Sequence, residues 1–158
     1  AQTATVTVAS TDVETTLVGA GEGSLTLLKN STLAGKTFKI SGAGVYSNTG
    51  TPTLNLQIKL GSVVVSATGA VTTVTSATNR VFKFDTLITV RSVGGSGTAF
   101  AQGVLLENSS QKLWPMGNTS TVAVDTTANL AFDITATWGT SSASNTISLT
   151  NLVIEEVN

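Results

Sequence analysis

The sequence predicts an all-β fold, a sandwich or a barrel, and three observations support this prediction. Apolar and polar residues alternate with a period of two along most of the chain, and helical periodicity is nearly absent. Turn-forming stretches recur roughly every 8–12 residues, as is typical of sandwiches and barrels. Serine and threonine make up more than a quarter of the chain, mostly in short alternating runs. We therefore expect eight or more antiparallel strands in one domain of 158 residues.

In the first half of the chain, the best-defined strand covers residues 54–60. Its leucines and isoleucine share one face, while Asn, Gln and Lys share the other. Gly61 and Ser62 then turn the chain into a hairpin with residues 63–65. Further strands are expected at 5–8, 24–28 and 36–46. Gly42-Ala43-Gly44 is expected to be a simple turn, because a phosphate-binding loop would need a helix after it.

In the second half, strands are expected at 80–91 and 98–106, on either side of the glycine-rich turn at 94–97. A strictly alternating strand covers 130–138, and it gives Trp138 the parity of the core. The last strand opens at Ile147. Its apolar parity shifts after Leu149, which predicts a β-bulge near Thr150-Asn151.

Residues 1–12 leave two alternatives open. Residues 1–10 carry no charge and alternate Thr with Val and Ala, so they have a strong strand propensity. The segment is either an N-terminal arm or the first strand of the sandwich. As an arm, it would pair with a sheet edge of a neighbouring copy or of a capsid through Thr5, Val6, Thr7 and Val8. Residues 13–158 are expected to form the single β-sandwich domain.

Residues 113–116 are expected to form a loop, because Trp114 and Met116 flank Pro115 outside any alternating strand. In one interpretation, Trp114 and Met116 are anchors that insert into a partner protein, since Trp is enriched at interface hot spots and Met packs adaptably. In the other interpretation, the segment is a plug over one end of the sandwich.

Composition argues for a protein that holds or binds something. The chain contains no histidine and no cysteine. This excludes Ser-His-Asp triads, cysteine nucleophiles and the usual zinc sites. We therefore expect no enzyme activity and no catalytic, cofactor-binding or metal-binding residues. The net charge of −1 includes no basic block, so nucleic acid is not an expected partner. No stretch approaches the ~20 apolar residues of a membrane span, so no membrane partner is expected either.

Several strand-and-turn pieces resemble small structural proteins of tailed bacteriophages. The resemblance extends over roughly residues 30 to 157, and its pieces are GKTFKISG at 35–42, YSNTGTPTL at 46–54, KLG at 59–61, TVRSVGGSGT at 89–98 and WGTSSASNTI at 138–147. Such proteins are similar to jelly rolls that trimerise on the virion, either as decoration (cement) proteins or as heads of fibres. The matching pieces are strand-and-turn motifs, and the resemblance implies no active-site residues.

The resemblance implies a virion structural protein that decorates the capsid exterior as a homotrimer. Its partner would be the major capsid protein, and assembly would take place in the host cytoplasm. Some apolar residues are not needed to fill the core and would suit a threefold interface, namely Leu87, Val64 and Val153. The alternatives are a receptor- or glycan-binding fibre head and a secreted carbohydrate-binding module. The lack of a coiled-coil or repeat shaft favours decoration over a fibre head, and an aromatic content of 5% disfavours the secreted module.

Overall fold

The computed structural model describes residues 4–19, 26–107 and 112–158, and every regular element within these residues is a β-strand. None of them is a helix that could span a membrane. The strands are β1 (Val6–Ala9), β2 (Thr15–Thr16), β3 (Thr26–Leu27), β4 (Thr37–Ser47), β5 (Thr53–Leu60), β6 (Val63–Ala67), β7 (Val71–Thr72), β8 (Arg80–Ser92), β9 (Thr98–Glu107), β10 (Lys112–Gly117), β11 (Val122–Ala123), β12 (Leu130–Trp138) and β13 (Thr146–Glu156).

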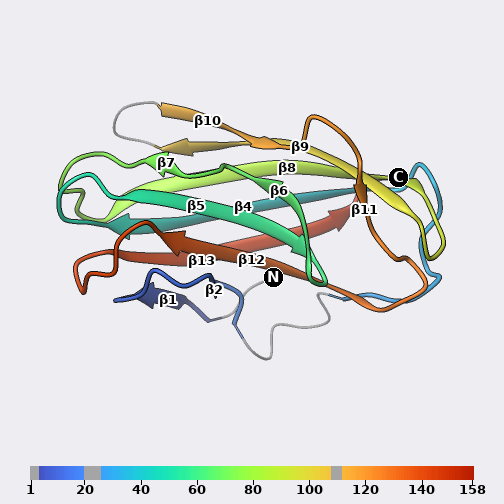
Figure 1. Ribbon diagram of the computed structural model, residues 1–158, viewed down its shortest axis with the longest axis horizontal. Helices are drawn as coiled ribbons and strands as arrows, with labels where there is room; N and C mark the ends of the chain where they lie inside the picture. The colour runs from blue at the N-terminus through green and yellow to red at the C-terminus, as the bar shows by residue number, and fades with distance from the viewer. Residues whose placement is uncertain (1–3, 20–25, 108–111) are drawn as a thin grey trace.

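The strands form two antiparallel sheets. Sheet A has the order β1-β13-β4-β8-β9-β10, and β11 also pairs with β9. Sheet B has the order β2-β12-β5-β6, with β3 pairing with β12 and β7 pairing with β5. In Figure 1, β5, β6 and β12 of sheet B lie in front of sheet A, and the strands of both sheets run along the long axis. The prediction of a β-sandwich is therefore confirmed.

The strand order is that of a jelly roll. Taken in chain order, β1, β2, β4, β5, β6, β8, β12 and β13 alternate between the sheets, except that β5 and β6 form a hairpin. The first, eighth, third and sixth of these eight strands form one sheet, and the second, seventh, fourth and fifth form the other. This is the two-sheet arrangement of the jelly roll. The hairpin of β9 and β10 is an addition that widens sheet A beyond β8.

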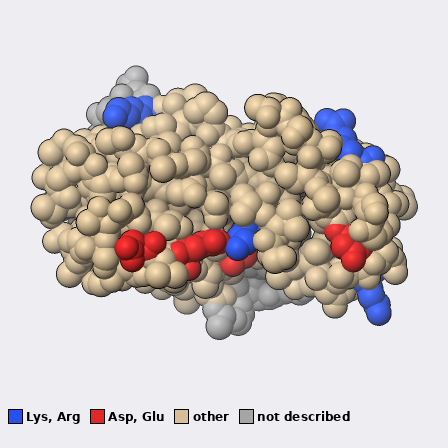
Figure 2. Space-filling view, in the orientation of Figure 1, with Lys and Arg blue, Asp and Glu red and all other residues tan. Residues whose placement is uncertain are grey.

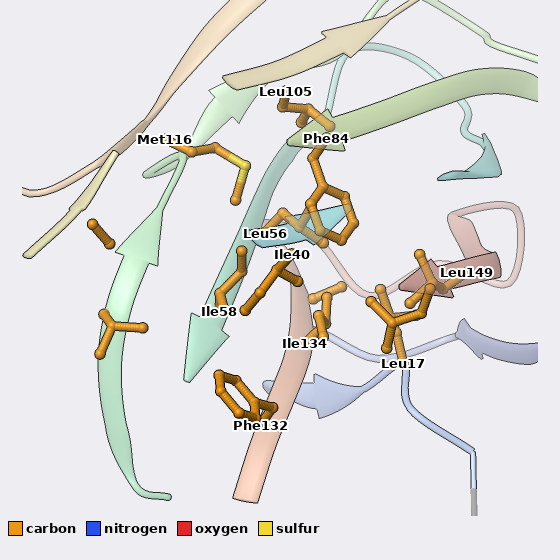
Figure 3. Close-up of a cluster of buried hydrophobic side chains, with 14 of the residues drawn as sticks. Leu17, Ile40, Leu56, Ile58, Phe84, Leu105, Met116, Phe132, Ile134 and Leu149 are labelled. Carbon is orange, nitrogen blue, oxygen red and sulfur yellow. The ribbon is translucent and has the colours of Figure 1, made fainter. Parts of the chain in front are cut away.

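The core lies between the two sheets, because alternate residues of the long strands point inward and are buried. Figure 3 shows Ile40 and Phe84 of sheet A packed with Leu56, Ile58 and Ile134 of sheet B. Two aromatic pairs bridge the sheets at opposite ends of β4. Phe38 contacts Phe132 with ring centroids 5.6 Å apart, and Tyr46 contacts Trp138 at 6.3 Å. Trp138 is 1% exposed, which confirms its predicted place in the core.

The sequence predicted most of the long strands, including one irregularity. The register between β13 and β4 shifts between Leu149 and Asn151, which confirms the predicted bulge. The hairpin of β5 and β6 is also confirmed. The predicted strand at 24–28 lies partly outside the described residues, and only Thr26–Leu27 is seen as a strand.

Two predictions about local structure are wrong. Gly42 and Gly44 do not form a turn but lie inside β4, opposite Phe84 and Phe82 of β8. Their missing side chains leave space for these two rings. Residues 113–116 do not form a loop but belong to β10, which pairs with β9. Its proline is tolerated because β10 is the edge strand of sheet A.

The N-terminal segment forms a strand of the chain's own sandwich. Residues Val6–Ala9 form β1, which pairs with β13 from Val6 opposite Leu149 to Ala9 opposite Thr146. Val8 is 3% exposed and belongs to the core. Of the two alternatives for residues 1–12, the structure therefore has the first strand, and residues 1–3 lie outside the described part of the chain.

Candidate protein-interaction surface

The charged side chains lie mostly on the surface, and eight of them form ion pairs. Four ion pairs join strands or neighbouring residues: Lys36 with Glu156, Lys39 with Glu155, Lys59 with Glu14, and Lys83 with Asp85. In residues 4–19, 26–107 and 112–158, no three acidic side chains gather in a way that could hold a metal ion. These ion pairs link neighbouring parts of the surface.

One polar cluster fastens the short strand β2 to sheet B. The Lys59 ammonium and the Thr135 hydroxyl each donate a hydrogen bond to Glu14 Oε1, both at 2.8 Å. The Thr16 hydroxyl donates to Asp133 Oδ1 at 2.5 Å. The hydrogen bond from Lys59, followed by that from Thr135, lowers the pKa of Glu14. Each contact links the 14–16 segment to β5 or β12, so we assign the cluster a structural role.

A cavity between the two sheets is too small for a substrate. The cavity beside Tyr46, Phe82, Leu105 and Trp114 has a volume of only about 10 Å³, which is about the space that one water molecule needs. Burial raises the pKa of Tyr46, and the nearby Glu107 carboxylate raises it further. The phenol is therefore neutral at physiological pH and forms part of the packed interior.

The side chains of β10 divide between the core and the surface. Met116 is 1% exposed, and in Figure 3 it points into the hydrophobic cluster near Leu56 and Phe84. Trp114 is partly buried and packs against the same core, with the Lys112 ammonium 6.0 Å from the centroid of its ring. As found here, Met116 cannot insert into a partner without leaving the core. The neighbour that does reach the surface is Leu113, which is 63% exposed.

The outer face of sheet A carries a cluster of exposed apolar side chains around Leu113. Leu106 lies opposite Leu113 across β9 and β10, and Val104 lies opposite Pro115. Val81 lies opposite Val45 across β4 and β8, diagonally next to Leu106. We call this cluster the outer-face patch, and it comprises Val45, Val81, Val104, Leu106, Leu113 and Pro115. Its leucines and Val81 are between 44% and 63% exposed.

Further apolar residues extend the patch over the same face. Leu87 on β8 and Val153 on β13 are 50% and 48% exposed, and both belong to the outward row of their strands. With Val81, Leu106 and Leu113, this face carries five of the ten large apolar side chains that are exposed in the described residues. Polar and charged residues lie between some of these side chains, since Leu87 is opposite Lys39 and Val153 is opposite Ser41. A face that exposes this many large apolar side chains is a candidate site of protein association.

The charges beside the outer-face patch neutralise one another. Lys83 lies 3.0 Å from Asp85, which also accepts a hydrogen bond from Ser41 Oγ at 2.5 Å. Burial works to raise the pKa of Asp85, but the bonds from Ser41 and Lys83 outweigh it and lower the pKa. The face therefore combines apolar area with paired charges, a combination that suits a protein partner better than a charged polymer.

The outer face of sheet B differs from that of sheet A. Figure 2 shows wide uncharged areas over this side, with one group of acidic and basic side chains across its lower middle and other charged side chains near its ends. Near one edge, a shallow groove of about 640 Å³ lies between the β6–β7 turn and the β9–β10 hairpin. Its lining is uncharged and includes Thr68, Gly69, Gln102, Pro115, Asn118 and Thr119.

Comparisons with protein-family models, with curated proteins and with solved structures find no match for this chain.

Sequence reasoning found part of this surface. It singled out Leu87 and Val153, which lie on the outer face of sheet A, and Val64, which lies on β6 of sheet B. It missed Leu106 and Leu113. A usable signal was the run Val104-Leu105-Leu106, in which apolar residues occupy both faces of a strand.

Proposed function

We propose that this chain is a non-enzymatic virion structural protein, a decoration protein that binds the outside of a phage capsid as a homotrimer. The observation that carries the proposal is the outer-face patch on sheet A. A sandwich already has a complete core, so exposed apolar residues on an outer face favour contacts with other protein chains. The jelly-roll strand order and the resemblance to phage structural proteins point to the same kind of protein.

The mechanism of decoration is mechanical. A capsid under internal pressure fails where neighbouring subunits separate, and a trimer that bridges several subunits adds buried area across those joints. An interface of about 1,600 Å² is enough for stable association. Three linked copies bind with avidity, because the second and third contacts form at a high effective concentration. The uncharged surfaces of the chain suit contacts that resist changes in salt, since screening acts on charges.

Two measurements test the proposal. Light scattering coupled to gel filtration should give a mass near three times 16.0 kDa or a whole multiple of that mass. A low-resolution density map of the particle that carries the protein should show knobs in high copy number on the shell. A few copies at the tail would instead identify a fibre component, and the decoration role would then be wrong.

The groove beside the β6–β7 turn favours a second candidate, the glycan-binding head of a fibre. Its volume of about 640 Å³ lies within the range of small-molecule sites. Its hydroxyl, amide and glycine lining suits a neutral ligand rather than an ionic one. Calorimetric titration with a panel of neutral oligosaccharides tests this candidate. Saturable heat that disappears in Gln102→Ala would support it, and the absence of heat across the panel would exclude neutral glycans as ligands.

A further inference from the structure

The edges of the two sheets differ in how they are protected against pairing with another strand. The N–H of Asn118 donates to the carbonyl of Ala101 at 3.1 Å. Because backbone hydrogen bonding alternates along an antiparallel pair, the N–H and C=O groups of the even-numbered residues of β10 bond to β9. Those of the odd-numbered residues point to the open edge. Pro115 therefore occupies the middle of this edge, where an N–H would otherwise point outward. Proline at such a position blocks the addition of a further strand.

The edges of sheet B are also protected. At β6, the side-chain amide of Asn118 donates to the backbone carbonyl of Val65 at 2.6 Å, so this acceptor is already occupied. At the opposite edge, β2 and β3 contain two residues each, which is too little for a stable ladder with another chain. Very short edge strands are themselves a device against pairing between molecules.

The β1 edge of sheet A shows no such protection within Thr5–Ala9. The N–H of Val157 donates to the carbonyl of Thr37 at 2.9 Å, so the odd-numbered residues of β4 bond to β13. On β13, the partners of these odd-numbered β4 residues are Thr146 and Ser148. The backbone groups of the alternate residues, Ile147 and Leu149, therefore form hydrogen bonds with β1. Their partners on β1 are Val8 and Val6. The backbone groups of Thr5, Thr7 and Ala9 therefore point away from β13, at a stretch without proline or charge.

We propose that the β1 edges of two copies of this chain pair antiparallel across a twofold axis, with Thr7 opposite Thr7 of the second copy. This register places Val6 opposite Val8 of the second copy and keeps the inward face apolar in both molecules. β-branched residues opposite one another favour such a ladder. Within the described residues, a second copy offers no other open edge of this length, because its β10 and β6 edges are protected and β2, β3, β7 and β11 contain only two residues each. The two A sheets then form one continuous sheet.

This contact is separate from the outer-face patch. The outer-face patch extends from β4 to β10 on one face of sheet A, whereas the pairing contact uses the backbone edge of β1, and Figure 1 shows β1 and β10 at opposite margins. One molecule can therefore use both contacts. The edge contact links copies in pairs, whereas the proposed trimer uses the outer face. Neither contact depends on the other.

The absence of cysteine from the chain allows a direct test of the register. Thr7→Cys should form a covalent dimer under mild oxidation, because its Cα would meet that of the second copy within the ~4.4–6.8 Å that a disulfide spans. Thr5→Cys alone and Ala9→Cys alone should not, since their symmetry mates lie roughly 13 Å apart along the strand. A mixture of these two variants should form the cross-linked pair. Equal cross-linking at all three positions, or none at position 7, would overturn the proposal.

A proline substitution tests whether the backbone edge is responsible. Thr7→Pro removes the outward N–H and leaves the ladder with β13 in place, as Pro115 does on β10. Thr7→Ala is the matched control, because both variants lose the hydroxyl contact with Ser148 (2.6 Å) but only one loses the N–H. We expect Thr7→Pro to weaken pairing at least tenfold, and Thr7→Ala to pair like the wild type, with similar melting temperatures. A trimer that forms in wild type and Thr7→Pro alike, without cross-linking at position 7, would support the threefold contact and overturn edge pairing.

Discussion

Gly42 on β4 lies directly opposite Phe84 on β8, and a Cβ atom at Gly42 would lie 2.4 Å from the Phe84 ring. The ring therefore occupies the space that a side chain at position 42 would need. Gly44 and Phe82 repeat the arrangement two residues along, with a distance of 2.8 Å. Two glycines in a strand interior weaken a sheet by themselves. Here they allow two phenylalanine rings to lie against the backbone of β4, so that the core is filled from β8.

This relationship predicts that Gly42→Ala destabilises the fold. The added methyl group must displace the buried Phe84 ring, and overpacking of this kind costs about 1–3 kcal/mol. Gly95→Ala is the control, because a Cβ at Gly95 would meet nothing within 4 Å. Chemical denaturation should show a lower midpoint for Gly42→Ala only. Equal midpoints in the two variants would contradict the role assigned to Gly42.

Substitutions on the inward and outward sides of β10 should differ in how much stability they cost. Met116→Ala should lower the free energy of unfolding by about 2–5 kcal/mol, because it empties part of the core. Leu113→Ala should change it by less than about 0.5 kcal/mol, since Leu113 is 63% exposed. Thermal or denaturant unfolding of both variants measures the difference. A neutral Met116→Ala would mean that residue 116 is an exposed anchor after all.

The outer-face patch predicts a loss of self-association when it is made charged. Leu106→Asp and Leu113→Asp should each lower the fraction of trimer, because burying an unpaired carboxylate at an interface is costly. Their melting temperatures should remain near that of the wild type, since both side chains already face water. Leu28→Asp is the control, as Leu28 is 60% exposed but lies outside sheet A. Light scattering at several concentrations checks this, and trimers that survive both patch variants would place the threefold contact elsewhere.

The hydrogen bonds of Glu14 should make the stability of the fold depend on pH in the acid range. Hydrogen bonds from Lys59 and Thr135 lower the pKa of Glu14 below the ordinary value of 4.5. A group with a lowered pKa in the folded state adds stability above its unfolded pKa, and this stability is lost as the pH falls through the folded pKa. Glu14→Gln should therefore be less stable than the wild type at pH 7, and the difference should shrink below about pH 4.5.

Denaturation of Glu14→Gln and of Asp12→Asn across this pH range measures the effect. Asp12 is exposed and lies two residues away, so its variant controls for a general change in surface charge. We expect the effect at Glu14 to be small, because the side chain is 39% exposed and solvent screens its ion pair. A Glu14→Gln difference that stays constant from pH 7 to pH 3 would contradict the assignment.

The alternation of residues was enough to predict the long strands, because each buries one face only. Leu54 and Leu60 bracket β5 as expected, and the parity change after Leu149 located the bulge in β13. Gly42 was misjudged because glycine signals a turn locally, while its reason here is the Phe84 ring, which comes from a strand 42 residues later. The loop predicted at residues 113–116 was wrong because β10 is an edge strand interrupted by proline, which removes the usual local signal.

The interaction surface was less predictable, because a face is assembled from strands that are distant in sequence. Leu106 and Leu113 lie opposite each other only through the register of β9 and β10. Val45 and Val81 come together only because β4 pairs with β8. Alternation tells which residues of one strand share a side, but it does not tell which strand lies next. The strand order therefore had to be known before the outer-face patch could be recognised.

The pairing of β1 with β13 has a consequence for the synthesis of the protein on the ribosome. Thr7 and Ser148 are hydrogen-bonded neighbours, yet 141 positions separate them along the chain. β13 fills the place between β1 and β4, so the nascent chain exposes these two strand edges until residues 146–156 have emerged. Sheets closed by such distant contacts form slowly, because a long loop must be ordered first. A nascent chain that lacks residues 146–156 is therefore expected to be prone to aggregation through these two edges, and a chaperone that shields strand edges would act before β13 emerges.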